Sequence, residues 1–211
     1  MKEASMGETR TVPSDALAPW AEIVPRRKRA TVDELLVLPD DGWRYEVVEG
    51  MLVRMVGSGE EATTIAFNLG AELRAFARPR RLGVVTGADG VYKFPGAETG
   101  LLPDVGFYAA ERRALIIDRS KPIPFAPDLA VEVASPLQDS EVMAAKARLY
   151  LRGGTRLVWV IWPERRAIDV WHPGDSDRPR ATLSADDTLD GEDVVPGFVY
   201  PVADVFADPL G

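Results

Sequence analysis

Two stretches of the chain carry apolar residues at the spacing of an amphipathic helix. In residues 58–77 the large apolar side chains recur at intervals of four, four and three residues, and Arg78-Pro79 marks the end of the pattern. These side chains are Ile65, Leu69, Leu73 and Phe76. Residues 138–151 form a second helical stretch, which is rich in alanine and is closed by the glycines at 153–154.

Strands are predicted where branched and aromatic residues form short runs or alternate with polar ones. Two pairs of runs are joined by turn residues and predict hairpins: one at 43–55, turning at Glu49-Gly50, and one at 156–172, turning at 163–166. Further strands are expected at 104–108 and 129–135, with one bent strand or two short ones at 84–94.

The order of these elements predicts the fold class. A helix at 138–151 lies between the strands at 129–135 and 156–162, which favours a right-handed β-α-β crossover between parallel strands. The hairpins are antiparallel by construction. We therefore expect an α/β (α+β) protein whose mixed sheet is flanked by helices.

The 211 residues are enough for one domain with a substantial core. Residues 1–28 contain three prolines and no sustained periodicity, so they are predicted to form a flexible N-terminal tail. The domain is expected to span residues 29–211 and to open with a short helix, since Thr31 and Glu34 have the spacing of a capping box. Neither a secretory signal nor a membrane-spanning run is recognisable, and we expect a cytoplasmic protein.

Composition narrows the chemistry. The chain has no cysteine and a single histidine, His172, which excludes thiolate chemistry and cysteine zinc sites and argues against a histidine-based triad. Nucleotide-binding glycine loops are also missing. The net charge of −8 lacks the basic footprint of a passive DNA-binding protein. It is compatible with an enzyme in which carboxylates bind a metal that neutralises phosphates.

Glu132 is the most informative carboxylate. In the run 129–135 (LAVEVAS) side chains alternate between two faces, so Glu132 shares its face with Ala130 and Ala134 in a strand that reads as buried. An isolated buried carboxylate is costly and requires a cation, a metal or strong hydrogen-bond donors. The alternatives are a buried ion pair with an arginine or an edge strand that leaves Glu132 in solvent.

Asp104 begins a similar strand and shares a face with Gly106 and Tyr108. On its own, Pro103-Asp104 also reads as an ordinary turn. Two acidic residues on the same face of neighbouring strands would, however, form a site for a hard divalent cation, Mg²⁺ or Mn²⁺.

Lys146 is one of only five lysines and lies inside the predicted helix 138–151. Four strand residues from Glu132 advance about 13 Å, and eight helical residues from 138 to 146 advance about 12 Å. If the helix runs back antiparallel to the strand, Lys146 returns to the level of Glu132, and Tyr150 lies on the same helical face. The alternative is a lysine on a solvent-facing side of the helix.

These residues resemble the PD-(D/E)xK nuclease superfamily and, within it, the Uma-two family of restriction endonucleases. The resemblance covers roughly residues 31–207. The segments that carry it, in order, are LPDDGWRYEVVEGMLV at 38–53, PDVGFY at 103–108, DLAVEVASP at 128–136, KARLYLRGG at 146–154, RLVWVIWP at 156–163 and DTLDGEDVVPGF at 187–198.

The resemblance implies a restriction-endonuclease-like core and metal-dependent hydrolysis of DNA. It implies that Asp104 and Glu132 hold the metal, with the main-chain carbonyl of Val133 as a further ligand. A lysine would stabilise developing charge or position the attacking water. Glu46 falls in a strand that contributes a carboxylate in the family, although an exposed hairpin residue is an equally good interpretation.

The sequence departs from the family pattern in three places. Ala134 stands at the usual lysine position, so that Lys146 has to substitute. Glu61 stands near a position where relatives carry histidine, and Trp162 replaces an acidic residue.

Three functional hypotheses follow from the sequence. The first is a metal-dependent DNA endonuclease, expected to be a two-fold homodimer because duplex DNA has two antiparallel strands. The alternative is a catalytically silent nuclease-fold protein that binds nucleic acid or a protein partner. A metal-dependent hydrolase of another phosphoester is a third class.

Overall fold

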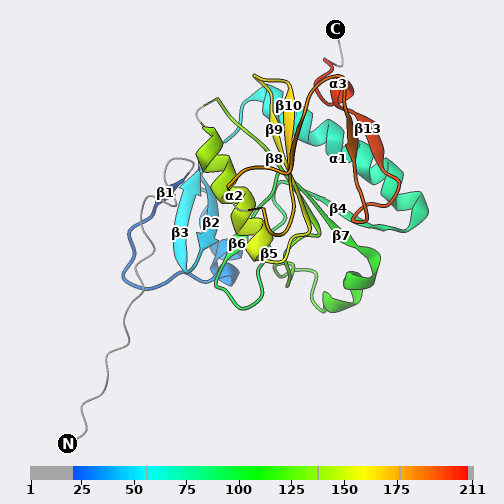
Figure 1. Ribbon diagram of the computed structural model, residues 1–211. Coiled ribbons are helices and arrows are strands. Elements are labelled where there is room, and N and C mark those ends of the chain that lie inside the picture. The colour runs from blue at the N-terminus through cyan, green and yellow to red at the C-terminus, as the bar shows by residue number, and fades with distance from the viewer. Residues whose placement is uncertain (1–20, 56, 137, 176, 209–211) are drawn as a thin grey trace, which may run out of the picture.

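The computed structural model describes residues 21–208 except residues 56, 137 and 176 (Figure 1). Most of the predicted tail therefore lies outside the described residues. Within them, β1 (Glu22–Ile23) pairs antiparallel with β3 (Met51–Met55), so regular structure is present before residue 29.

A six-stranded mixed sheet forms the centre of the molecule, with strand order β11-β10-β9-β8-β7-β4. The central strands are β7 (Val105–Ala109), β8 (Leu129–Val133) and β9 (Leu157–Trp162). The outer strands are β4 (Gly83–Gly87), β10 (Ala167–Trp171) and β11 (Ala181–Leu183). Only β8 and β9 pair in parallel, as the predicted β-α-β crossover requires; the other neighbours are antiparallel.

The two long helices cover opposite faces of this sheet (Figure 1). Helix α1 (Glu60–Arg80) packs Leu69 and Leu73 on the face that presents Val131. Helix α2 (Ser140–Arg152) packs Met143 and other side chains on the opposite face. The strand β8 divides as its alternation predicts: Val131 and Val133 join the α1 core, and Ala130 joins the α2 core.

A second, five-stranded sheet lies beside α2, with the order β1-β3-β2-β6-β5. It contains β2 (Arg44–Val48), β5 (Tyr92–Lys93) and β6 (Gly100–Leu101). The predicted hairpin β2-β3 turns at Glu49 and Gly50, both with positive φ, as a type I′ hairpin turn requires. The apolar side chains Val48 and Val53 of this hairpin join the α2 core, which fixes β2 against the central sheet.

The C-terminal part packs on the α1 side. It comprises β12 (Thr188–Asp190), β13 (Val199–Pro201) and α3 (Val202–Val205), of which the last was expected at 202–206. The part of the chain that the structure describes also contains two 3-10 helices, η2 (Val32–Val37) and η3 (Ala110–Leu115). In η2 the main-chain N–H of Thr31 donates to the Glu34 carboxylate, as the capping box predicts. None of the described helices is long and apolar enough to cross a bilayer.

Candidate active site

Side chains from four separate elements meet between α2, the central sheet and β2. They are Glu46 from β2, Asp104 from the residue preceding β7, Glu132 from β8, and Lys146 and Tyr150 from α2. Glu46, Glu132, Lys146 and Tyr150 are all buried. We refer to these five residues as the carboxylate–lysine cluster.

Glu132 is held from two sides. Its Oε2 atom accepts a hydrogen bond of 2.9 Å from Nζ of Lys146, and its Oε1 atom accepts one of 2.6 Å from the hydroxyl of Tyr150. The strand is central and only 5% of Glu132 is exposed, which excludes the solvent-facing edge position. The cation that compensates Glu132 is a lysine, so the alternative of an arginine ion pair is also wrong.

Lys146 reaches Glu132 by the path that the sequence predicts. Asp139 caps α2 by accepting a hydrogen bond from the N–H of Val142. The helix then returns along the sheet and brings Lys146 level with Glu132. Only 4% of Lys146 is exposed, so the lysine does not lie on a solvent-facing side of the helix. Its Nζ atom also lies 3.4 Å from Oε1 of Glu46, which makes it the shared cation of two carboxylates.

Glu46 is completely buried, and the interpretation as an exposed hairpin residue is wrong. Its Oε1 atom accepts a hydrogen bond of 2.9 Å from the N–H of Leu102. Its Oε2 atom is buried and has no hydrogen-bond partner. A buried carboxylate oxygen without a donor is unusual in a folded protein and marks a place where a ligand, proton or water is expected.

Asp104 lies next to Glu132 across the sheet. The pairing of β7 with β8 joins Val105 to Val131, and one further residue along this antiparallel register joins Asp104 to Glu132. The Oδ2 atom of Asp104 accepts a 2.8 Å hydrogen bond from the N–H of Val133, which turns the carboxylate toward β8. The Pro103-Asp104 pair is therefore more than a surface turn.

Arg44 is a member of this neighbourhood that the sequence reading missed. It precedes Glu46 by two residues on β2, so both side chains leave the same face of that strand. One guanidinium nitrogen donates to the carbonyl of Ala88 at 2.6 Å, and another lies 3.9 Å from Oδ1 of Asp104. Its Nε atom is buried without a partner. The signal available in the sequence was its two-residue spacing from Glu46.

Burial and neighbouring charges shift the ionisation of the cluster. Burial raises the pKa of Glu132 to about 7, and the charges of Asp104 and Glu46 add to this effect, against the opposing influence of Lys146 and the Tyr150 hydrogen bond. Burial alone would lower the pKa of Lys146, but the surrounding carboxylates outweigh it and raise that pKa. Lys146 therefore stays charged at neutral pH, and Glu132 is the group that changes its protonation.

The oxygen atoms of the carboxylate–lysine cluster suit a hard divalent cation only in part. Carboxylate oxygens are the ligands that Mg²⁺ prefers, and the unpartnered Oε2 of Glu46 shows spare acceptor capacity here. Among the described residues, however, no three Asp, Glu, His or Cys side chains gather closely enough to ligate a metal by themselves. A cation would need one or two carboxylates together with main-chain oxygens, water or a phosphate, which is the usual arrangement for Mg²⁺.

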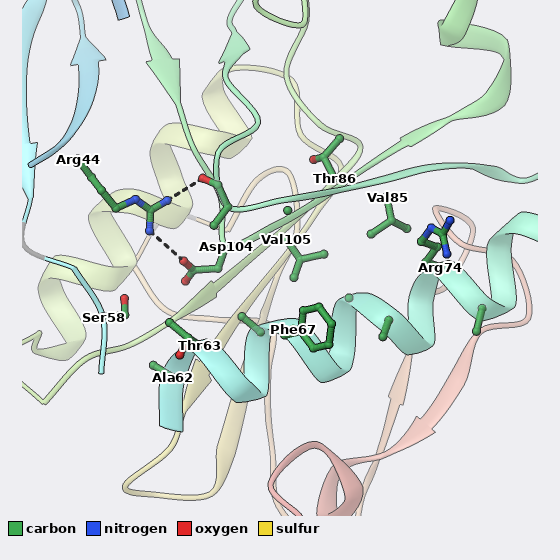
Figure 2. A pocket seen from close by; sticks show the side chains of 16 residues that line it. Arg44, Ser58, Ala62, Thr63, Phe67, Arg74, Val85, Thr86, Asp104 and Val105 are labelled. Atoms are coloured by element: carbon green, nitrogen blue, oxygen red, sulfur yellow. Dashed lines mark hydrogen bonds and ion pairs between the residues drawn. The ribbon is translucent and has the colours of Figure 1, made fainter. Parts of the chain in front are cut away.

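A cavity of about 490 Å³ opens beside the cluster (Figure 2). Arg44 and Asp104 line one end of it, and it extends between α1 and β4 toward Arg74. The carboxylate–lysine cluster is buried, but through Asp104 it borders a space that a substrate can enter.

Comparison with known proteins agrees with this architecture. Residues 32–203 match the model of the family Uma2, described as "Putative restriction endonuclease". The chain belongs to the Uma2 family. This is the Uma-two family that the sequence motifs resemble, so the resemblance found in the sequence is confirmed. The match includes every member of the carboxylate–lysine cluster.

The chain also resembles a solved structure in its fold. The crystal structure of "a putative nuclease belonging to DUF820" from Anabaena variabilis superposes with a TM-score of 0.66. The two chains are 20% identical, and the alignment covers 83% of this chain and 97% of the other. This likeness confirms the predicted fold class. No curated protein matches the chain.

Proposed function

We propose that this Uma2 protein is an endonuclease that hydrolyses DNA phosphodiester bonds with the help of Mg²⁺ or Mn²⁺. The observation that supports it best is the position of Lys146, buried between Glu132 and Glu46 with Asp104 alongside. Such a cluster places an ammonium and two buried carboxylates next to Asp104, the member of the cluster that lines the cavity. These are the groups that phosphodiester hydrolysis requires once a divalent cation is bound.

In this proposal, Asp104, Glu132 and the main-chain carbonyl of Val133 would hold the cation. When bound, the cation acidifies a water molecule and neutralises charge on the phosphate. Lys146 has three N–H donors, and its two carboxylate neighbours engage at most two of them. The remaining donor is available to orient the attacking water or to stabilise a phosphate oxygen.

The hydroxyl of Tyr150 and the amine of Lys146 keep the Glu132 carboxylate in one orientation, so its position is fixed before substrate arrives. Glu46 keeps Lys146 charged and in place through its own negative charge. In the reaction, the water oxygen bonds to phosphorus as one ester P–O bond breaks. This yields a phosphate monoester and a hydroxyl group on the other strand end.

The decisive experiment is cleavage of supercoiled plasmid by the purified protein with Mg²⁺, Mn²⁺ or EDTA. We expect nicking or linearisation with either metal and none in EDTA. Glu132→Gln should be inactive, because the amide keeps the shape but loses the charge. Glu141→Gln is the matched control, since the same change on α2 affects an exposed carboxylate whose side chain is 84% accessible.

A plasmid that stays intact with every metal would contradict the proposal. If the protein nevertheless shifts DNA on a gel, the catalytically silent DNA-binding protein becomes the better hypothesis. Cleavage of small phosphodiesters without cleavage of DNA would indicate the third class, a hydrolase of other phosphoesters.

A further inference from the structure

The cavity beside Asp104 continues as a groove along α1. Figure 2 shows Phe67 and Arg74 projecting from one side of α1 toward Val85 and Thr86 of β4. A smaller hollow of about 200 Å³ shares Arg74 and Val85 with it and continues to Arg78. We call this combined space the α1–β4 groove. From Phe67 to Arg78, α1 advances about 16 Å, which is enough to follow a few nucleotides.

Phe67 is an unusual residue on the wall of this groove. It is 76% exposed, although burial of a phenylalanine side chain typically stabilises a protein by about 1.5–3 kcal/mol. Its neighbours one helical turn away are Thr63, Gly70 and Ala71, all small. Gly70 also packs closely on β7, because a Cβ there would meet Val105 at 3.2 Å. The Phe67 ring is therefore largely uncovered by neighbouring side chains and can stack against a flat ligand.

The charge of the groove differs from that of the whole chain. The protein has a net charge of −8, whereas the charged residues lining the groove are three arginines and one aspartate. Arg74 and Arg78 form no ion pair with any described residue, so their charges are not compensated within that part of the chain. Arg44, at the Asp104 end, has a buried Nε atom without a partner. These cations suit a polyanion.

We propose that the α1–β4 groove binds single-stranded DNA, with a base stacked on Phe67 and phosphates bound by Arg74 and Arg78. The strand would then run toward Arg44 and Asp104, where the carboxylate–lysine cluster begins. A base inside a duplex already has both faces stacked, so an isolated exposed aromatic ring is useful only to an unpaired base. This inference rests on the proposed nuclease function for its ligand, and it adds the strand type and the contacts.

The test is fluorescence anisotropy with a labelled oligothymidylate and with a duplex of the same length. The background is Glu132→Gln, which prevents cleavage, and binding is measured in EDTA and in calcium. We expect tighter binding of the single strand than of the duplex. Phe67→Ala should weaken single-strand binding by about five- to a hundredfold, the equivalent of losing one base–aromatic stack. Phe67→Trp should preserve it.

Arg74→Ala provides an independent readout. Loss of one phosphate contact should lower the slope of log K against log salt concentration by about 0.7. Arg152→Ala is the matched control, since it removes an exposed arginine at the end of α2, outside the groove. Thermal unfolding checks that each variant is folded.

The outcomes separate this inference from the nuclease proposal. Any one of three results would overturn the groove proposal. The first is an unchanged affinity of Phe67→Ala for the single strand, the second is no measurable single-strand binding, and the third is binding of the duplex that is as tight or tighter. If the wild-type protein cuts plasmid in any of those cases, the nuclease proposal survives alone. If Phe67→Ala weakens single-strand binding as expected but the wild-type protein cuts no plasmid, the groove proposal survives and the nuclease proposal fails.

Discussion

The amine of Lys146 lies 2.9 Å from Oε2 of Glu132, fourteen residues away along the chain. The strand β8 advances from Glu132, the chain turns, and α2 carries Lys146 back to the same level. Residue 134, two positions after Glu132, is an alanine, so the ammonium next to Glu132 comes from the helix and not from the strand. The same geometry makes Lys146 a structural cation as well as a candidate catalytic group.

Lys146→Met should abolish plasmid cleavage and also destabilise the protein. Removing one partner of a buried ion pair leaves uncompensated charge and typically costs about 3–5 kcal/mol, and here both Glu132 and Glu46 lose their cation. Urea unfolding at pH 8 measures the loss. The double variant Lys146→Met/Glu132→Gln should recover part of it, because the amide carries no charge. A double variant no more stable than Lys146→Met would contradict the buried ion pair.

Tyr150→Phe removes the hydroxyl that donates to Glu132 but keeps the ring in the core. Hydrogen bonds to charged groups contribute about 1.5–3 kcal/mol, so we expect a destabilisation of that order in urea unfolding. Since this hydrogen bond lowers the pKa of Glu132, its removal should also move the acidic limb of the pH–rate profile upward. A merely structural role would change stability and leave the pH–rate profile in place.

Asp104→Asn should weaken binding of Mn²⁺, measured by isothermal titration calorimetry, and remove metal-dependent cleavage. The amide can no longer offer a charged oxygen, whereas its carbonyl can still accept from the N–H of Val133, so the fold should be retained. Asp118→Asn is a suitable control because Asp118 is an exposed carboxylate that also accepts a main-chain N–H, that of Ser120. Unchanged metal affinity in Asp104→Asn would remove Asp104 from the metal site.

A two-fold homodimer remains the expected assembly, because cutting both antiparallel strands of a duplex is simplest with two sites related by a dyad. The chain has a mass of 23.1 kDa, so light scattering should give about twice that value. A purely monomeric protein at micromolar concentration would contradict this prediction. Nicking of one strand would then be the expected cleavage pattern.

The central sheet could be predicted because the sequence patterns that define its strands extend over only a few consecutive residues. Period-two alternation assigned Glu132 and Asp104 to faces, and the helix 138–151 implied parallel strands on either side of it. Both hairpins and both long helices were recognised, although α1 includes Pro79 in its last turn and ends at Arg80. The shortest strands, such as β6 with two residues, hold too few residues to show any period.

The five-stranded sheet could not be predicted as a unit, and this limited the site. Glu46 approaches Lys146 only because β2 packs against α2, and Leu102, which donates to Glu46, follows the unrecognised β6. That contact joins residues 56 positions apart and leaves no periodic trace. Arg44 and Phe67 were missed for a similar reason, since exposure and proximity to a groove are tertiary properties.

The pKa of Glu132 leads to a prediction about stability. Its folded-state value is about 7, whereas an ordinary glutamate titrates near 4.5. Between these values the folded protein holds a proton that the unfolded chain has released. The free energy of unfolding should therefore rise as the pH falls from 7 toward 4.5, by at most about 1.4 kcal/mol per pH unit from this group. Lys146, whose pKa is raised, stays charged throughout this window and contributes no slope.

Glu132→Gln isolates this effect because it removes the titrating group and leaves all others in place. Urea unfolding of both proteins in EDTA at several pH values between 5 and 8 gives the difference directly. Relative to Glu132→Gln, the wild-type protein should gain stability toward acid pH, while its cleavage rate falls below pH 7 as Glu132 takes up its proton. Parallel stability curves would show that the carboxyl titrates normally, and that burial at this position does not prepare it to exchange a proton near neutral pH.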